Sequence, residues 1–299
     1  MTLFNTLLLR EWLQYKRAWI GLVLAPVLVL LALVPFSQVD DIDVPSPEPV
    51  ALIAGLLTVG LVLALALAVS VYQLMGLARR DQQDRSIEFW SSLPGSHAAS
   101  IGAPIVAHGI LVPVAATLLA LVGGAIVGSA MAFKEFGLAA LQQTQWSALF
   151  AATLWLGLRL AVGLVLAALW LSPIVLALMA ASAWLKRWGA PLLVIAVSAF
   201  LNIYKNETAA EVLRNALITQ VAGVGASLVQ TGTRLVIDSD REGHLNMQDF
   251  FDMLYRFPDY ARDGLPQVLQ AAWHPQFVGG LVIAGLCFWL LVLQRKRSL

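Results

Sequence analysis

Acidic side chains recur at alternate positions in DSDREGHLNMQD, which covers residues 238–249. Oxygen ligands at this spacing, with a glycine at the sharp bend, are the pattern of a calcium-binding EF-hand loop. The matching residues are Asp238, Asp240, Glu242, Gly243 and, at the closing position, Asp249. Two features depart from the template, because Glu242 replaces a shorter Asp or Asn and Asp249 replaces the bidentate Glu. A polar connector between two amphipathic helices is therefore the favoured interpretation.

Motifs of the common catalytic and nucleotide-binding sites do not occur in the sequence. There is no G-x-x-x-x-G-K-[ST] loop, no H-E-x-x-H helix and no G-x-S-x-G turn. The histidines, which show no ligand spacing, are His97, His108, His244 and His274. The single cysteine, Cys287, stands in an apolar run, so we expect a buried, inert thiol. The sequence gives no support for catalysis in this chain, and we expect no catalytic, cofactor or metal site.

One charged residue, Arg159, stands inside a long apolar run, between LWLGL and LAVGL. An arginine in the bilayer core is costly and marks a functional site by default. Near the membrane surface, an arginine instead extends its guanidinium to the headgroups at little cost. Since the topology derived below puts Arg159 close to the outer surface, we favour the second interpretation.

The stretch 79–100 combines charged side chains with bulky apolar ones. Its part 86–93 fits a short helix that presents Phe89, Trp90 and Leu93, and the chain then reaches Pro94-Gly95. Exposed aromatic side chains surrounded by charges are typical of a docking surface for a soluble partner. The same side chains would equally anchor a helix in the lipid headgroup layer. Composition alone does not decide between the two.

The elements that position these residues follow from composition. Of the 299 residues, 59% are hydrophobic and 12% are charged, against about 45–50% and about 25% in average soluble domains. The mean hydropathy is +0.78. This leaves too little polar surface for a soluble globule, which excludes most soluble enzymes, disordered chains and nucleic-acid-binding proteins. We predict an all-α chain whose solvent is mainly the lipid bilayer.

Apolar runs long enough for membrane-spanning helices, which need about 20 residues, set the predicted topology. The predicted spans are 18–36, 50–77, 101–133, 160–185, 190–204 and 276–293. The apolar run 146–185 would form a helix about 60 Å long, twice the ~30 Å hydrocarbon core. A hairpin at Pro173 or Arg159 would leave one arm too short to cross. We therefore expect one span there, preceded by an interfacial or tilted lead-in at 138–158.

Charge placement sets the predicted orientation, because cytoplasmic segments of membrane proteins are enriched in Lys and Arg. Basic residues cluster at both ends of the chain and between spans two and three and spans four and five, at Arg10, Lys16, Arg17, Arg79, Arg80, Arg85, Lys186, Arg187, Arg295, Lys296 and Arg297. The short outer loops hold Lys134 beside Asp40, Asp41, Asp43, Glu48 and Glu135. Tryptophans near span ends, as in an aromatic belt, are Trp19, Trp146, Trp184, Trp188 and Trp273. We predict six spans with both termini in the cytoplasm.

Two amphipathic helices are expected in the outer segment, at 207–229 and 247–255. Their apolar-spaced positions are Leu213, Leu217, Gln220, Val221 and Val224 in the first and Phe250, Met253, Leu254 and Phe257 beyond. They could lie on the outer leaflet, cap a dimer or receive a partner, but packing against the protein's own spans is favoured. Close helix packing is also the favoured role of Gly123, Gly124, Gly128, Gly157 and Gly163.

Three stretches together resemble the type-2 ABC exporter permeases. RDQQDRSIEFWSSLPGSHAASIGAP is similar to the loop between the family's second and third spans. The start LLLREWLQYKRAW is similar to the amphipathic elbow helix before its first span. LWLSPIVLALMAASAWLKRWGAPLL resembles its fourth span and the turn into the fifth. Each motif is loose, and their order within a six-span plan carries the resemblance. The outer segment is the part least like the family.

The resemblance implies a bacterial inner-membrane permease that dimerises, as a homodimer or with a close homologue, and pairs with two copies of a separate ATPase subunit. The loop between spans two and three would insert into a cleft of that ATPase. Arg85 and Glu88 would then be polar contacts, Phe89 and Trp90 packed anchors, and Leu93 part of the same ATPase-coupling interface. The missing P-loop fits, since nucleotide chemistry would belong to the other chain.

The predicted organisation has three parts. Residues 1–204 hold the elbow helix and five spans with the cytoplasmic coupling loop 78–100, residues 205–275 form an extracytoplasmic helical segment, and residues 276–299 form the sixth span and a basic tail. The predicted function is the permease subunit of an ATP-driven exporter, with no nucleic acid partner. The alternative is a six-span assembly or sensing subunit whose outer segment binds a partner. A lipid-modifying enzyme is a weaker third option, because a convincing polar constellation is missing.

Overall fold

The structure is a computed structural model that describes residues 3–37, 46–83, 96–205, 207–229 and 247–297. Its regular elements in these ranges are all helical, which confirms the all-α prediction. Five helices are long and apolar enough to cross a membrane, so the chain has the character of a multi-pass membrane protein. The candidate spans are Phe4–Phe36, Pro47–Leu77, His97–Ala139, Trp146–Leu185 and Pro275–Arg297.

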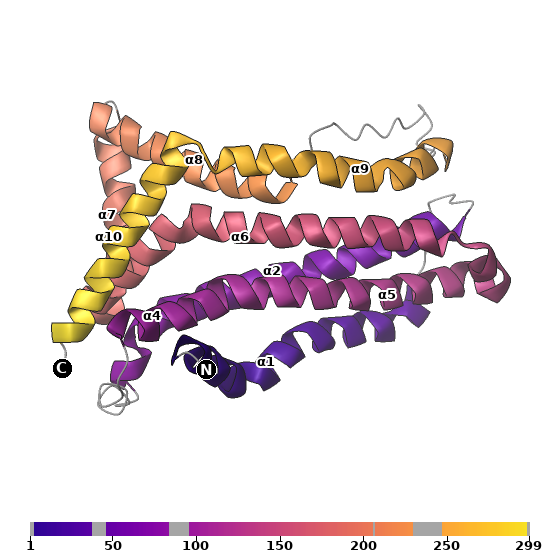
Figure 1. The fold of residues 1–299 in the computed structure, drawn as a ribbon, viewed down its shortest axis with the longest axis horizontal. Coiled ribbons are helices and arrows are strands. Elements are labelled where there is room, and N and C mark those ends of the chain that lie inside the picture. The colour runs from indigo at the N-terminus through magenta and orange to yellow at the C-terminus, as the bar shows by residue number, and fades with distance from the viewer. Residues whose placement is uncertain (1–2, 38–45, 84–95, 206, 230–246, 298–299) are drawn as a thin grey trace.

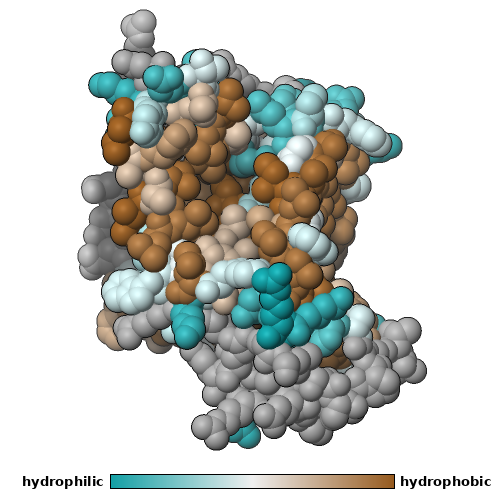
Figure 2. All heavy atoms as spheres, turned by 90° about the vertical axis from the view of Figure 1, so that its left-hand side faces the viewer, coloured by the Kyte–Doolittle hydropathy of each residue, from teal (hydrophilic) through white to brown (hydrophobic). Residues whose placement is uncertain are grey.

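The predicted fifth span is shorter than the others. Helix α7 (Gly189–Ile203) has 15 residues, which corresponds to about 22 Å against a hydrocarbon core of about 30 Å. Figure 2 shows the end of the molecule that carries α7 and α10 (Pro275–Arg297), with a broad hydrophobic band between hydrophilic residues above and below. Exposed side chains of both helices are apolar there, among them Ile195 and Leu286. This surface is suited to contact with lipid.

The N-terminal region is one continuous helix, α1 (Leu3–Leu33), followed by the short turn η1 (Val34–Phe36). The predicted elbow is therefore the first part of the same helix and not a separate element. Helix α2 (Pro47–Gln83) follows. The N-terminus and the C-terminus lie at the same end of the molecule (Figure 1).

The predicted third span contains a π-helical turn. Helix α4 (His97–Val106) leads into a π-helical turn, η2 (Ala107–Leu111), and then into α5 (Val112–Gln143). Pro104 lies inside α4 and Pro113 in the first turn of α5, and neither residue has an N–H for the helical ladder. Helix α5 has a kink at Gly137, whose φ of 75° is easily adopted only by glycine.

Helix α6 (Trp146–Leu185) is continuous over 40 residues. The predicted lead-in at 138–158 is wrong, because residues up to Gln143 belong to α5 and the chain turns at Thr144 and Gln145. Pro173 does not end the helix. It cannot donate to the carbonyl of Leu169, but the hydroxyl of Ser172 donates to that oxygen at 2.7 Å, so the free acceptor is satisfied.

Close helix contacts form where the glycines lie, as predicted. Helices α2 and α5 pack together so tightly that a β-carbon added to Gly124 would lie only 2.6 Å from the carbonyl oxygen of Gly55. One turn further, a β-carbon on Gly128 would lie 2.2 Å from the carbonyl oxygen of Ala51. Both distances are below van der Waals contact, so these positions accept only glycine at the present separation of the helices.

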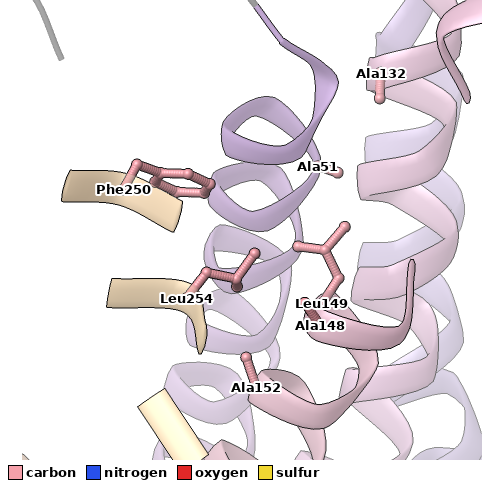
Figure 3. Close-up of a cluster of buried hydrophobic side chains, with 7 residues drawn as sticks. All are labelled: Ala51, Ala132, Ala148, Leu149, Ala152, Phe250 and Leu254. Atoms are coloured by element: carbon pink, nitrogen blue, oxygen red, sulfur yellow. The ribbon is translucent and has the colours of Figure 1, made fainter. Parts of the chain in front are cut away.

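The outer helices pack against the bundle. Helix α9 (Met247–Ala271) runs alongside α6 in Figure 1, and Figure 3 shows Phe250 and Leu254 directed at side chains of α2 and α6. The cluster comprises Ala51, Ala132, Ala148, Leu149, Ala152, Phe250 and Leu254. Helix α8 (Thr208–Val229) packs on α6 and α10, although Val221 is exposed. The favoured packing against the protein's own spans is thus confirmed.

Candidate functional site

The predicted ATPase-coupling residues Arg85, Glu88, Phe89, Trp90 and Leu93 lie outside the described residues. The structure describes the helices on either side of them. Helix α2 ends at Gln83. On the other side, the Ser96 hydroxyl accepts a hydrogen bond from the backbone N–H of Ala99 at 3.1 Å and so caps the start of α4.

Both flanking helices are anchored in one apolar cluster. Leu74 and Leu77 of α2 and Ile101 of α4 pack with Met179 on the last part of α6 and with Leu291 of α10. Movement of either flank would therefore act on two further spans, because close-packed side chains transmit displacement.

Basic residues gather at this end of the chain's fold. They belong to the first part of α1, the end of α2, the turn η3 (Lys186–Trp188) and the end of α10. The guanidinium carbon of Arg297 lies 5.4 Å from the ring centroid of Trp184, a cation–π distance that ties α10 to α6. This end of the molecule also carries both termini (Figure 1), and its assignment to the cytoplasmic side stays a prediction.

Two buried ionisable side chains meet at the π-helical turn. His108 is 0% exposed and Glu11 is 1% exposed, and the His108 Nε2 lies 3.3 Å from the Glu11 Oε2. Two aromatic rings stand nearly perpendicular to the imidazole, that of Tyr15 at 5.1 Å and that of Trp19 at 5.4 Å between centroids. Sequence reasoning missed this pair, although Glu11, Tyr15 and Trp19 share one face of α1 by their spacing of four.

No family model, curated protein or solved structure matches the chain.

Arg159 is buried, which corrects the prediction that it extends to the headgroups. Its side chain is 4% exposed, and its Nη1 donates to the carbonyl oxygen of Ser227 at 2.6 Å. Ser227 lies in the last turn of α8, where carbonyl groups have no partner within the helix and carry the negative end of the helix dipole. Arg159 therefore caps α8 from α6.

A second cap lies where α2 and α6 begin. The carboxylate of Glu48, 4% exposed at the start of α2, accepts a hydrogen bond from the backbone N–H of Gln145 at 3.2 Å. A carboxylate at a helix N-terminus is favourable, so Glu48 helps to set where α6 begins. The hydroxyl of Tyr255 bonds to the side chain of the same Gln145, which links α9 to this corner.

A groove of about 520 Å³ lies between α2, α5 and α6. Almost all of its lining is apolar, and one of its few hydroxyls, on Ser129, donates to the carbonyl oxygen of Ala125 at 2.7 Å. A molecule in the groove would find little hydrogen-bonding demand, so the lining suits an apolar chain.

Among the residues that the structure describes, no three His, Cys, Asp or Glu side chains are grouped to hold a metal ion. Of the EF-hand-like loop, residues 238–246 and the side chain of Asp249 lie outside that description. Calcium binding there stays a hypothesis.

Proposed function

We propose that the chain is the permease subunit of an ABC exporter, embedded in a bacterial inner membrane as a dimer and coupled to two copies of a separate ATPase subunit. The observation that carries the proposal is the segment RDQQDRSIEFWSSLPGS, which joins α2 to α4 at the basic end of a multi-pass helical protein. Nucleotide binding would belong to the partner, and this chain would convert its closure into movement of the spans.

The proposed coupling runs from the ATPase through the flanks of the segment. Phe89 and Trp90 would fill a cleft of the ATPase, with Arg85 and Glu88 as polar contacts and Leu93 at the edge of the surface. Displacement of α2 and α4 would then reach α6 and α10 through the cluster around Met179. Six crossings per chain, with α7 as the short one, belong to this proposal.

The alternative, an assembly or sensing subunit whose outer segment binds a partner, has less support. The apolar face of α9 is already occupied, since Phe250 and Leu254 are 3% and 1% exposed inside the bundle. This leaves less apolar surface for a partner on that helix.

The test is a search for a neighbouring reading frame that encodes a P-loop ATPase, then co-purification of that ATPase with this chain and ATPase assays of the complex. Changing Phe89 and Trp90 together to Ala is expected to weaken the complex by at least about thirtyfold, because even one buried aromatic anchor at an interface contributes about 2 kcal/mol or more. The rate of ATP hydrolysis by the ATPase should then be the same with and without the variant permease.

A matched control changes Phe36 and Trp273 to Ala, an aromatic pair that is 80% and 84% exposed. This variant should bind the ATPase as the wild type does. The coupling assignment fails if the Phe89/Trp90 variant binds and supports ATP hydrolysis like the wild type.

A further inference from the structure

The contact between α1 and the π-helical turn of the third span contains ionisable side chains, which are rare inside membrane-spanning segments. Its centre is an ionisable pair, His108 and Glu11, completely enclosed by protein. The imidazole stands nearly perpendicular to the rings of Tyr15 and Trp19, so three residues on one face of α1 contact a single side chain of the π-helical turn.

The π-helical turn is a built feature of the backbone. Pro104 and Pro113 stand on either side of η2, and the π-helical turn between them interrupts the regular α-helical hydrogen bonding of the span. Single π turns inside helices are frequent at functional sites. His108 is the second residue of this turn, so its side chain moves whenever the turn moves.

The pair carries a cost that apolar packing would not. The Nδ1 atom of His108 has no hydrogen-bond partner among the described residues, so the imidazole is best satisfied when Nε2–H donates to Glu11 and Nδ1 keeps its lone pair. Leucine or phenylalanine at these positions would bury without any such demand, and replacing a buried polar pair by apolar residues is often neutral or stabilising. What the polar pair adds is a directional link, which apolar contact lacks.

We propose that Glu11 and His108 are positioning residues. Their hydrogen bond holds the first part of α1 in a fixed position against the π-helical turn η2, so that α1 follows any movement of α4. The role in a transport cycle rests on the proposed function above, whereas the positioning itself does not. Helix α4 is continuous with the turn that carries His108, so a displacement of α4 reaches the pair without an intervening loop.

The test uses spin labels on exposed positions of the two elements, Leu13 of α1 and Val122 of α5, in a chain with Cys287→Ala. Val122 stands ten residues after Val112, which places it about 15 Å beyond the π-helical turn. Distances are compared in the wild type, in Glu11→Gln, which keeps an oxygen acceptor, and in Glu11→Leu with His108→Phe, which keeps a ring between Tyr15 and Trp19.

In the chain alone, the wild type and Glu11→Gln should give one narrow distance distribution. The Leu/Phe variant should give a broad one while its unfolding temperature stays close to that of the wild type. A narrow, wild-type distribution in the Leu/Phe variant overturns the proposal. If that variant does not fold, Glu11→Leu with His108→Leu takes its place under the same criterion.

A second measurement adds the ATPase and a non-hydrolysable ATP analogue. The distance in the wild type and in Glu11→Gln should shift, and the Leu/Phe variant should lose this shift. An equal shift in all three contradicts transmission through the pair. If the ATPase does not bind the wild type at all, the proposed function fails, and the positioning role is decided by the chain alone.

Discussion

Replacing Gly128 with leucine is expected to prevent the native packing of α5 against α2. The first added carbon would lie 2.2 Å from the carbonyl oxygen of Ala51, a backbone atom that moves only with its helix. Overpacking a core typically costs about 1–3 kcal/mol, and a full leucine here should reach or exceed the upper value. We expect the unfolding temperature in detergent, followed by tryptophan fluorescence, to fall by several degrees or the protein to aggregate.

The matched control is Gly60→Leu on α2, the helix against which α5 packs. A β-carbon on Gly60 has nothing within 4 Å, so the leucine should face open surface and leave the unfolding temperature unchanged or raised, since glycine is a poor helix former. Equal unfolding temperatures for both variants would show that the α2–α5 contact is looser than these distances require.

Replacing Arg159 with methionine is expected to detach the end of α8 from α6. The substitution keeps an unbranched chain of apolar atoms near the backbone but removes the guanidinium, which leaves the carbonyl of Ser227 without its 2.6 Å hydrogen bond. Hydrogen bonds to charged groups contribute about 1.5–3 kcal/mol, and the interaction with the helix dipole adds to this. Limited proteolysis of the protein in detergent should then cut near α8 faster than in the wild type.

Arg159→Lys separates charge from geometry. Lysine keeps the positive charge but presents a point charge on a shorter reach instead of a planar fork, so protection of α8 should be partial. If the methionine variant is cut at the wild-type rate, Arg159 does not hold the end of α8 in place.

Local patterns predicted much of the fold. The spacing of Leu213, Leu217 and Val224 and that of Phe250 and Leu254 identified the helix faces that pack on the bundle, because helical periodicity is a property of neighbouring residues. The glycine positions indicated the close approach of helices for a similar reason, since small side chains in apolar helices are permissive wherever they occur.

The polar contacts were not predictable in the same way, because each joins residues far apart in the chain. Arg159 meets a carbonyl 68 residues later, and His108 meets Glu11 across 97 residues. The prediction that Arg159 extends to the headgroups assumed that no other helix covers its side chain. Only the path of α8 shows that this helix covers it. The break between α5 and α6 was hidden similarly, because Glu48 caps Gln145 from another helix while Pro173, the obvious breaker, is compensated by Ser172.

Helix α6 has a mechanical consequence through its length. Between Trp146 and Pro173 it runs without a proline, a stretch of about 40 Å, with α9 and the start of α2 attached near one end and α4 and α10 attached beyond the other. Such a rod would act as a lever if it moved as one body. A tilt of about 5° at the proline would displace the far end by about 3–4 Å, enough to shift packed helices by the distances at which interfaces change state. Small movements at the basic end would thereby be magnified at the opposite one.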